Sequence, residues 1–449
     1  MQAMTTTTKF LVATMAAWGL SLSAEAADLM QTFHAAQSQD PVFAAAIAAH
    51  QASQEKLPQG RSLLLPSVNL NANSTYNKNR VQYFNAPATL PFPQGQIQYN
   101  SHGYGVTLVQ PLFRQQNWVA YTESELQVAQ ADAQFKNAEN DLILRVAKAY
   151  FDVLIAQDSV ELAGAQKAAI SEQLEQAKRN FEVGTATITD TREAQSRYDL
   201  VVAQEIAAGN DLEIRQRQLQ QLTNSMPDNL RPLGDKFKLE APQPASMQKW
   251  VEQAEDGNLQ LAAAKISADL ADKEVARKRG GHYPTLDLVA NYSMNNANGG
   301  MYGVGSDIRS QSVGVQLNVP LFEGGATQSR YREAEANRDR AKDELENARR
   351  STDTQTRQAY LGVVNGMAQV KALQAALKSS ESLLEASKLG QEVGVRTNLD
   401  VLNAQQQLYS TRRDLYQSEY NYLISELQLK AAVGILSEKD LSAVNQALY

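Results

Sequence analysis

An internal repeat constrains the fold of this 449-residue chain more than any other feature. Three pairs of matching positions show the repeat: Pro66 and Pro284, Pro111 and Pro320, and Gly184 and Gly394. The offsets within these pairs are 218, 209 and 210 residues. The chain is therefore predicted to build one architecture twice, with a loop in the first copy that is nine residues longer.

Each copy opens with two segments in which apolar and polar side chains alternate. The four segments lie at about 66–77, 102–111, 284–295 and 311–320. A period of two is typical of a strand with one apolar and one polar face. Strands of about 10 residues with a polar face suit an outer-membrane barrel with an aqueous lumen. The polar residues between the paired segments, 78–100 and 297–309, are expected to form external loops.

Most of the remaining chain is predicted to be helix with a heptad rhythm. Small and apolar residues recur at spacings of 3 and 4 over 345–384. The same stripe recurs over 135–174, and only Lys167 interrupts it. The stretch 114–181 contains no proline and would form a rod of about 100 Å. Rods of this length are not expected in a compact globular enzyme.

The helices are predicted to reverse at two tight tips. Gly184 and Gly394 stand where a helix end favours glycine. Three residues later, two Thr-x-x-Asp sequences match the capping box that begins a following helix: Thr187 to Asp190 and Thr397 to Asp400. Each copy is therefore expected to end in a helical hairpin.

The N-terminus predicts export from the cytoplasm. Lys9 precedes the apolar stretch 10–22, and Ala24-Glu25-Ala26 fits a small-x-small cleavage site, so residues 1–26 are predicted to be a signal peptide. The mature chain is then expected to comprise a first repeat (27–224), a connector (225–256), a second repeat (257–434) and a C-terminal segment (435–449).

Composition argues against several other classes of protein. The net charge of −7 disfavours nucleic-acid binding. The absence of cysteine removes disulfides, thiol nucleophiles and thiolate metal sites. The four histidines lack metal-ligand spacing, and the sequence carries no recognisable catalytic motif. We therefore expect neither enzymatic activity nor a cofactor or metal.

Four strands cannot close a barrel with a usable lumen, because about eight strands only just enclose side chains. The unpaired strand edges must be satisfied by other chains. The sequence thus predicts an oligomer, although this reasoning does not fix the number of chains.

With these features, the chain resembles the TolC family of outer-membrane efflux and type I secretion ducts. Three features support this resemblance: the two Glu-Val-Gly tips, the sequence RTNLDVLNAQQQLY over 396–409, and four prolines at strand–helix junctions, which are Pro66, Pro111, Pro284 and Pro320. The resemblance implies a homotrimer in which four strands per chain form a 12-stranded barrel in outer-membrane lipid. It also implies a long α-helical barrel in the periplasm, with the connector and the C-terminal segment forming a belt around its equator.

The same resemblance implies a function in transport. Family members dock through a periplasmic adaptor onto an inner-membrane translocase of the ABC or RND type, and they pass drugs or unfolded proteins outward. The cargo, the adaptor and the translocase do not follow from the sequence. The alternative is a periplasmic or surface coiled-coil protein, such as a filament or adhesin subunit. Amphipathic strands bracketed by prolines argue against that alternative.

The resemblance also assigns roles near the hairpin tips. Asp400 matches an acid that constricts the periplasmic entrance, and Asn403 stands where the family has a second acid. Arg396 and Asp190 match a link that locks the entrance, whereas Gln391 replaces a tyrosine of that network. The residues that would dock onto the adaptor are Val183, Gly184, Thr185, Val393, Gly394 and Val395. Helix capping is an alternative role for Asp190 and Asp400.

Overall fold

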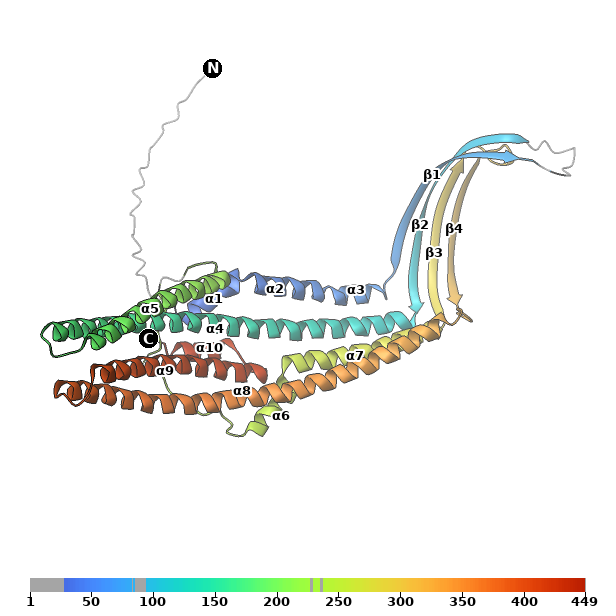
Figure 1. Ribbon diagram of the computed structural model, residues 1–449. Helices are drawn as coiled ribbons and strands as arrows, with labels where there is room; N and C mark the ends of the chain where they lie inside the picture. The colour runs from blue at the N-terminus through green and yellow to red at the C-terminus, as the bar shows by residue number, and fades with distance from the viewer. Residues whose placement is uncertain (1–27, 83, 85–93, 227–228, 235–236, 449) are drawn as a thin grey trace, which may run out of the picture.

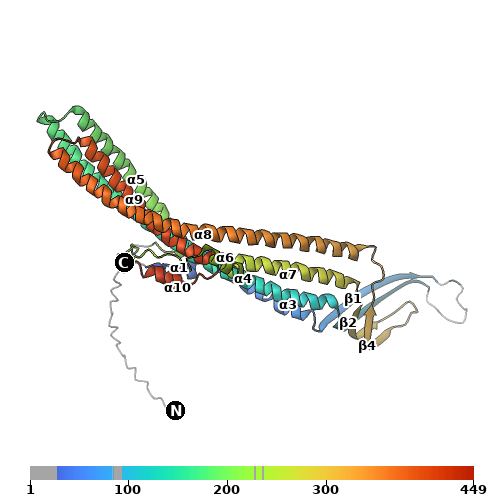
Figure 2. The ribbon, with the colours of Figure 1, turned by 90° about the horizontal axis from the view of Figure 1, so that it is seen from below.

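The computed structural model describes residues 28–82, 84, 94–226, 229–234 and 237–448, so the predicted signal peptide lies outside the described residues. Long helices run side by side as rods, and a four-stranded sheet projects from one end of them (Figures 1 and 2). In the described part of the chain, every helix is too short or too polar to span a membrane.

Two helices of nearly equal length dominate the molecule. These are α4, with 68 residues, and α8, with 67 residues. At 1.5 Å per residue, each is a rod of about 100 Å. The shorter α5 and α9 run back along α4 and α8 to form the two hairpins. The bounds of these four helices are Gln115–Glu182 (α4), Ile188–Thr223 (α5), Ala326–Glu392 (α8) and Asn398–Ala432 (α9).

The heptad stripe explains which faces of the rods are buried. Every stripe position in 345–384 is buried or half-buried, as in a coiled-coil seam. In the first copy, Lys167 interrupts the stripe, and its ammonium group lies 2.8 Å from the Glu205 carboxylate on α5. An opposite charge on the partner helix thus compensates the one polar position in the stripe.

The four strands form one antiparallel sheet in the order β1-β2-β3-β4. Their bounds are Ser67–Val81 (β1), Gly95–Phe113 (β2), Thr285–Ala297 (β3) and Ser306–Asn318 (β4). Pairing extends further into the polar segments than alternation alone indicated, and β2 starts seven residues before the expected position 102. In β1, backbone pairing continues through Lys78, Asn79 and Arg80, polar residues that the hydropathy pattern assigned to a loop.

Short helices and the connector lie around the middle of the rods, and α2, α3 and α7 continue from there toward the sheet (Figure 1). The short helices are α1 (Leu29–Gln39), α2 (Pro41–Gln54), α3 (Lys56–Ser62), α6 (Met247–Gly257), α7 (Leu259–Arg279), the 3₁₀ turn Gly280–His282, and α10 (Glu438–Asn445). The main hydrophobic core lies here, where side chains from α1, α4, α9 and α10 meet those of the connector.

Two buried tyrosines hold the connector against the rods. The Tyr150 hydroxyl donates to the Arg231 carbonyl and accepts from the Arg231 amide, both at 3.0 Å. The Tyr422 hydroxyl donates to the Glu240 carbonyl at 2.7 Å and accepts from the Glu240 amide at 3.1 Å. The connector has little secondary structure of its own, and these side chains hydrogen-bond its backbone groups.

Candidate functional site

The two hairpin tips have the same backbone geometry and lie at the end of the rods opposite the sheet (Figure 1). Gly184 has a φ of +79° and Gly394 a φ of +78°, a conformation that favours glycine. Thr187 and Thr397 each form a capping box with an aspartate three residues later. The structure thus confirms the predicted glycines and both capping boxes.

The tips present exposed apolar side chains to solvent. Val183, Val393 and Val395 are 73%, 68% and 78% exposed. A Cβ atom added at Gly184 or Gly394 would have open space around it. The six residues assigned to adaptor docking therefore lie together on two accessible turns, where a partner could reach them.

Asp400 caps its own helix. Its carboxylate accepts hydrogen bonds from the Thr397 amide and hydroxyl, both at 2.8 Å. These bonds, and then the Arg396 guanidinium 3.7 Å away, lower the pKa of Asp400 below its usual value. A capping role and a place in an entrance constriction are compatible, because the residue stays ionised and lies close to the tip.

The residues assigned to the entrance lock engage partners within their own hairpins. Arg396 lies beside Asp400, and within the described residues of one chain it makes no ion pair with Asp190. The Gln391 side-chain amide donates to the Asn398 side-chain carbonyl at 3.3 Å. The Asp190 carboxylate accepts from the Thr187 amide at 2.8 Å. A link between Arg396 and Asp190 would therefore have to form between hairpins of different chains.

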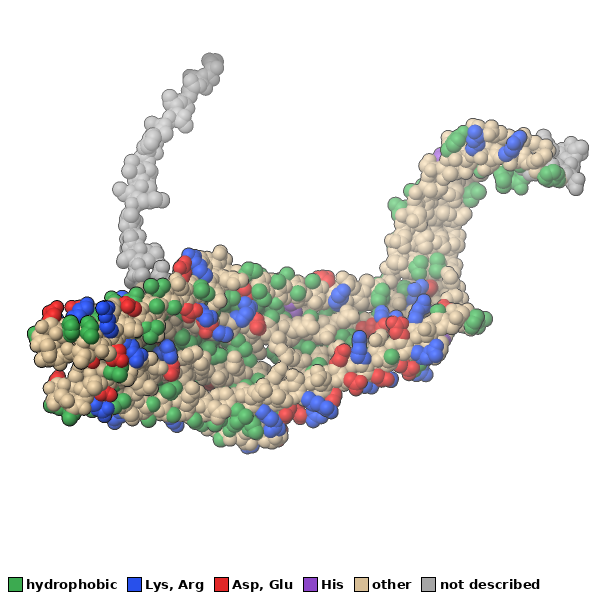
Figure 3. Space-filling model, in the orientation of Figure 1, with side chains coloured by type: hydrophobic (Ala, Val, Ile, Leu, Met, Phe, Trp, Pro, Cys, Tyr) green, Lys and Arg blue, Asp and Glu red, His purple; other side chains and the backbone are tan. Residues whose placement is uncertain are grey.

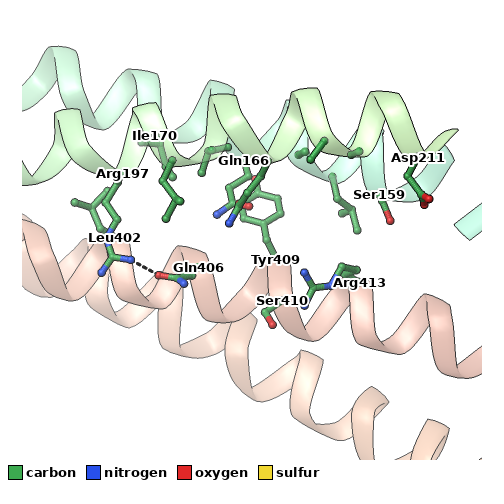
Figure 4. A pocket seen from close by; sticks show the side chains of 17 residues that line it. Ser159, Gln166, Ile170, Arg197, Asp211, Leu402, Gln406, Tyr409, Ser410 and Arg413 are labelled. Carbon is green, nitrogen blue, oxygen red and sulfur yellow. Dashed lines mark hydrogen bonds between the residues drawn. The ribbon is translucent and has the colours of Figure 1, made fainter. Parts of the chain in front are cut away.

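A different arginine connects the two hairpins inside one chain. Arg197 on α5 donates to the Asn403 side-chain carbonyl at 3.0 Å, and it also bonds the Gln406 side chain (Figure 4). Arg197 and Gln406 border a groove of about 480 Å³ between α4, α5 and α9. The sequence analysis did not identify Arg197, because it considered Asn403 only as the replacement of an acidic residue found in the family. A usable signal was a break in the repeat, since Gln407 stands 210 residues after Arg197.

The four junction prolines mark the change from strand to helix. Pro66 and Pro284 directly precede β1 and β3, Pro320 follows β4, and Pro111 lies inside β2, next to an irregularity in its pairing with β3. Beyond Pro111, the Arg114 guanidinium makes two hydrogen bonds, of 2.8 and 2.7 Å, to the Asp287 carboxylate. The sequence analysis did not predict this ion pair.

The described residues contain no cluster of three or more histidine or acidic side chains that could hold a metal ion.

Known proteins share both the sequence pattern and this fold. The family model "Outer membrane efflux protein" matches residues 32–225 and 250–435, two segments that follow the internal repeat. The chain is 36% identical over 432 residues to outer membrane protein TolC of Vibrio cholerae, covering 96% of this chain and 95% of that protein. It is 34% identical over 422 residues to the alkaline protease secretion protein AprF of Pseudomonas aeruginosa, covering 93% and 86%.

A solved structure shows the same architecture. The outer membrane channel CmeC of Campylobacter jejuni superimposes with a TM-score of 0.78 and 17% identity, covering 94% of this chain and 90% of that one. These likenesses, with the paired hairpins and the four-stranded sheet, confirm the expected resemblance and fold class. The chain belongs to the outer membrane efflux protein family, and it is an outer-membrane channel of the TolC type, serving secretion or efflux.

Proposed function

We propose that three copies of this chain form one continuous duct from the periplasm to the cell exterior. The main support for the proposal is that the two ends of the molecule differ and lie far apart. A sheet with unpaired edges lies at one end of rods about 100 Å long, and two accessible hairpin tips lie at the other end. Three sheets of four strands give the 12 strands of a barrel wide enough for a lumen. The helical hairpins would continue the passage below the membrane.

The tips would dock onto a periplasmic adaptor, and through it onto an inner-membrane translocase of the ABC or RND class. Exposed valines on glycine turns offer a small apolar surface to such a partner. The belt around the rods would comprise 225–256 and 435–449, where the connector and the C-terminal segment meet in a short bridge between Leu233 and Leu448. In this role the chain acts as a passage and not as an enzyme.

The entrance would be closed by links between hairpins. We infer that Arg197 contributes to this closure, because it joins α5 to α9 through Asn403 and Gln406. Arg396 and Asp190 would add a second link where hairpins of neighbouring chains meet. A filament or adhesin subunit, the alternative, has no evident use for a sheet whose strands alternate polar and apolar faces.

Fractionation and conductance test the proposed duct together. The mature protein should start near Ala27, sediment with outer membranes, run as a trimer in mild detergent and conduct ions in a planar bilayer. A protein that bypasses the membrane and appears as a monomer in periplasmic extracts would overturn the proposal.

A further inference from the structure

The outer part of the first strand pair carries positive charge without compensating acids. From Ser67 to Phe113, a stretch that comprises β1, β2 and the loop between them, the sequence contains Lys78 and Arg80 but no aspartate or glutamate. Both side chains are exposed, and within the described residues neither forms an ion pair. Figure 3 shows Lys and Arg side chains on the part of the sheet farthest from the rods. The passage through the duct uses neither residue.

Lys78 and Arg80 lie on the apolar face of β1. Alternation along the strand puts Val68, Leu70 and Tyr76 on the same face, where they are 63%, 70% and 62% exposed. From the rods outward, this face therefore changes from aliphatic side chains to an aromatic ring and then to two cations. In an outer-membrane barrel the apolar face contacts lipid, and aromatic side chains mark its borders. In the proposed duct both cations are thus on the lipid side of the barrel and not in its lumen.

The spacing along β1 places the two cations at the outer border of the membrane. A strand rises about 3.4 Å per residue, so Lys78 and Arg80 lie about 34–41 Å beyond Val68 along the strand. A strand tilt of about 45° reduces this to roughly 24–29 Å along the membrane normal. The apolar band of such barrels is about 25 Å tall. The cations therefore reach the level of the lipid headgroups, at the end of the molecule opposite the hairpin tips.

The neighbouring strand adds two amides to the same face. Lys78 pairs with Gln98 and Arg80 pairs with Gln96, and side chains directly opposite in an antiparallel pair lie on one side of the sheet. The Tyr76 hydroxyl donates to the Gln98 side-chain oxygen at 2.7 Å, which leaves the NH₂ group of Gln98 to donate elsewhere. These four side chains, two cations and two amides, form a basic patch that is rich in hydrogen-bond donors.

The second copy of the repeat has no equivalent of the basic patch. Its two strands contain one cation, Arg309, and the guanidinium of this residue lies 3.7 Å from the Asp307 carboxylate. The pairing of β2 with β3 ends at Ser101, so the basic patch lies on the part of the first hairpin that extends past the second. The extension presents its two charges to the membrane border without an acid beside them.

We propose that the basic patch binds the phosphate groups of lipid A, the phosphorylated glycolipid of the outer leaflet. The inference rests on the proposed duct, since it needs the apolar face of the sheet to contact the outer membrane. A guanidinium binds phosphate oxygens through two parallel N–H groups, and an ammonium adds a point charge.

The chemistry of the basic patch fits the glycolipid better than an ordinary phospholipid. A phosphate monoester carries about 1.5–2 negative charges at neutral pH, which suits two adjacent cations, whereas the phosphate diester of a phospholipid carries about one. The sugar hydroxyls of the glycolipid can also accept hydrogen bonds from Gln96 and Gln98. Three copies would carry three such patches around the outer rim of the barrel and hold it at a fixed depth in the leaflet.

Lipid binding to the purified trimer tests the proposal. The trimer in mild detergent is titrated with bisphosphorylated lipid A, with the same lipid after removal of its phosphates, and with phosphatidylglycerol, and native mass spectrometry counts the bound lipids. Bisphosphorylated lipid A should bind roughly tenfold more tightly than either of the others. Lys78→Gln/Arg80→Gln should remove this preference, whereas Lys78→Arg/Arg80→Lys keeps both charges and should retain most of it. The control Lys378→Gln/Lys388→Gln removes the same charge from exposed positions of α8 and should bind like the wild type.

Three results would overturn the proposal. The wild-type trimer binds lipid A equally with and without phosphate, or the preference survives in Lys78→Gln/Arg80→Gln, or phosphatidylglycerol binds as tightly as lipid A. If the double variant does not assemble, the single variants Lys78→Gln and Arg80→Gln decide, each with an expected loss of about threefold. A wild-type protein that is not a trimer in mild detergent would instead overturn the proposed duct, and this site with it.

Discussion

The two copies of the repeat have the same hairpin tips and differently buried rods. Gly184 and Gly394 differ by one degree in φ, and both following helices start with a capping box. Yet α4 buries 20 residues and α8 only 10, although their lengths are 68 and 67 residues. The local sequence pattern determines the backbone of each copy, whereas the neighbouring helices determine how much of each rod is buried. α4 lies in the middle of the chain's own helices, and α8 lies at an edge that another copy can cover.

Matched substitutions test whether the two hairpin tips contribute equally to export. Gly184→Asp and Gly394→Asp should each reduce export by at least about tenfold, because each adds charge and bulk to an apolar turn and strains a positive φ by about 1–2 kcal/mol. Export of a cargo in a strain that lacks its own duct measures the effect, with the trimer checked in mild detergent.

Two controls separate docking from strain. Gly184→Ala keeps the strain without the charge, and Gly209→Asp adds the charge to the exposed side of α5 with open space around it. Both should export nearly normally. Equal loss in Gly184→Ala would assign the effect to folding, and loss at only one of the two tips would end their equivalence.

The difference in burial is tested at a repeated tyrosine. Tyr150 is 0% exposed and bonds both backbone groups of Arg231, whereas its counterpart Tyr360 is half-buried and donates only to the Ala245 carbonyl, at 2.8 Å. Tyr150→Phe should lower the free energy of unfolding by about 1–3 kcal/mol, because it removes two hydrogen bonds between a fully buried hydroxyl and the Arg231 backbone. Tyr360→Phe should cost less than about 1 kcal/mol. Similar shifts in thermal unfolding would contradict the comparison.

A half-buried carboxyl in the first copy, that of Asp158, has alanine, Ala368, at its counterpart. The pKa of Asp158 is raised from 3.8 to about 6, because burial and, to a smaller extent, Glu161 outweigh the opposing hydrogen bond from the Tyr420 hydroxyl. The folded state therefore binds this proton more tightly than the unfolded state. Ionised Asp158 destabilises the fold above pH 6, and this penalty disappears as the pH falls through 6 toward 3.8.

Asp158→Asn should thus stabilise the protein at pH 7.5 by about 2 kcal/mol, and it should do little near pH 4. The asparagine carbonyl can still accept from Tyr420. Thermal unfolding at both pH values measures the difference, with Glu172→Gln on the exposed side of the same helix as the control. An equal effect at both pH values would show that the charge of Asp158 is not the cause.

Most of the backbone could be predicted from the sequence, but little of the side-chain pairing could. Heptad spacing, capping boxes and prolines are local signals, so they locate the rods and tips by themselves. The Arg197–Asn403 link and the Arg114–Asp287 ion pair join residues 206 and 173 positions apart. Nothing near these residues in sequence indicates which helix or strand will face them. Strand ends were also missed, since pairing outlasts hydrophobic alternation.

The two copies of the repeat also differ in the side chains that link the hairpins at the entrance. Arg197→Ala removes the bonds to Asn403 and Gln406 and should raise single-channel conductance about two-fold, because each exposed link holds only about 0–1 kcal/mol and three copies act together. Arg396→Ala should add to this rise if the link to Asp190 forms between chains. Arg192→Ala, on the same helix, serves as the control. Unchanged conductance in Arg197→Ala would assign closure to other contacts.

The smallest expected effect concerns the acids near the entrance. In the first copy, Asp190 and Glu193 stand three residues apart, whereas in the second copy Asp400 is followed by Asn403. Three-fold symmetry would place three Asp400 carboxylates around one axis, and such rings bind multivalent cations. In a single chain the capping bonds from Thr397 lower the pKa of Asp400, so the ring should be ionised at neutral pH despite the repulsion among its members.

One ring of single charges should give a modest block of the channel by a trivalent cation added from the periplasmic side. Asn403→Asp should strengthen that block by about tenfold, because it adds a second carboxylate ring. The new carboxylate still accepts the hydrogen bond from Arg197. Asp400→Ala should abolish the block, whereas Asp190→Ala removes the equivalent cap from the first copy and should leave the block in place. Planar-bilayer currents titrated with the cation measure all three variants. A block that survives in Asp400→Ala would leave this aspartate with its capping role alone, and the two tips would then be alike in function as well as in backbone.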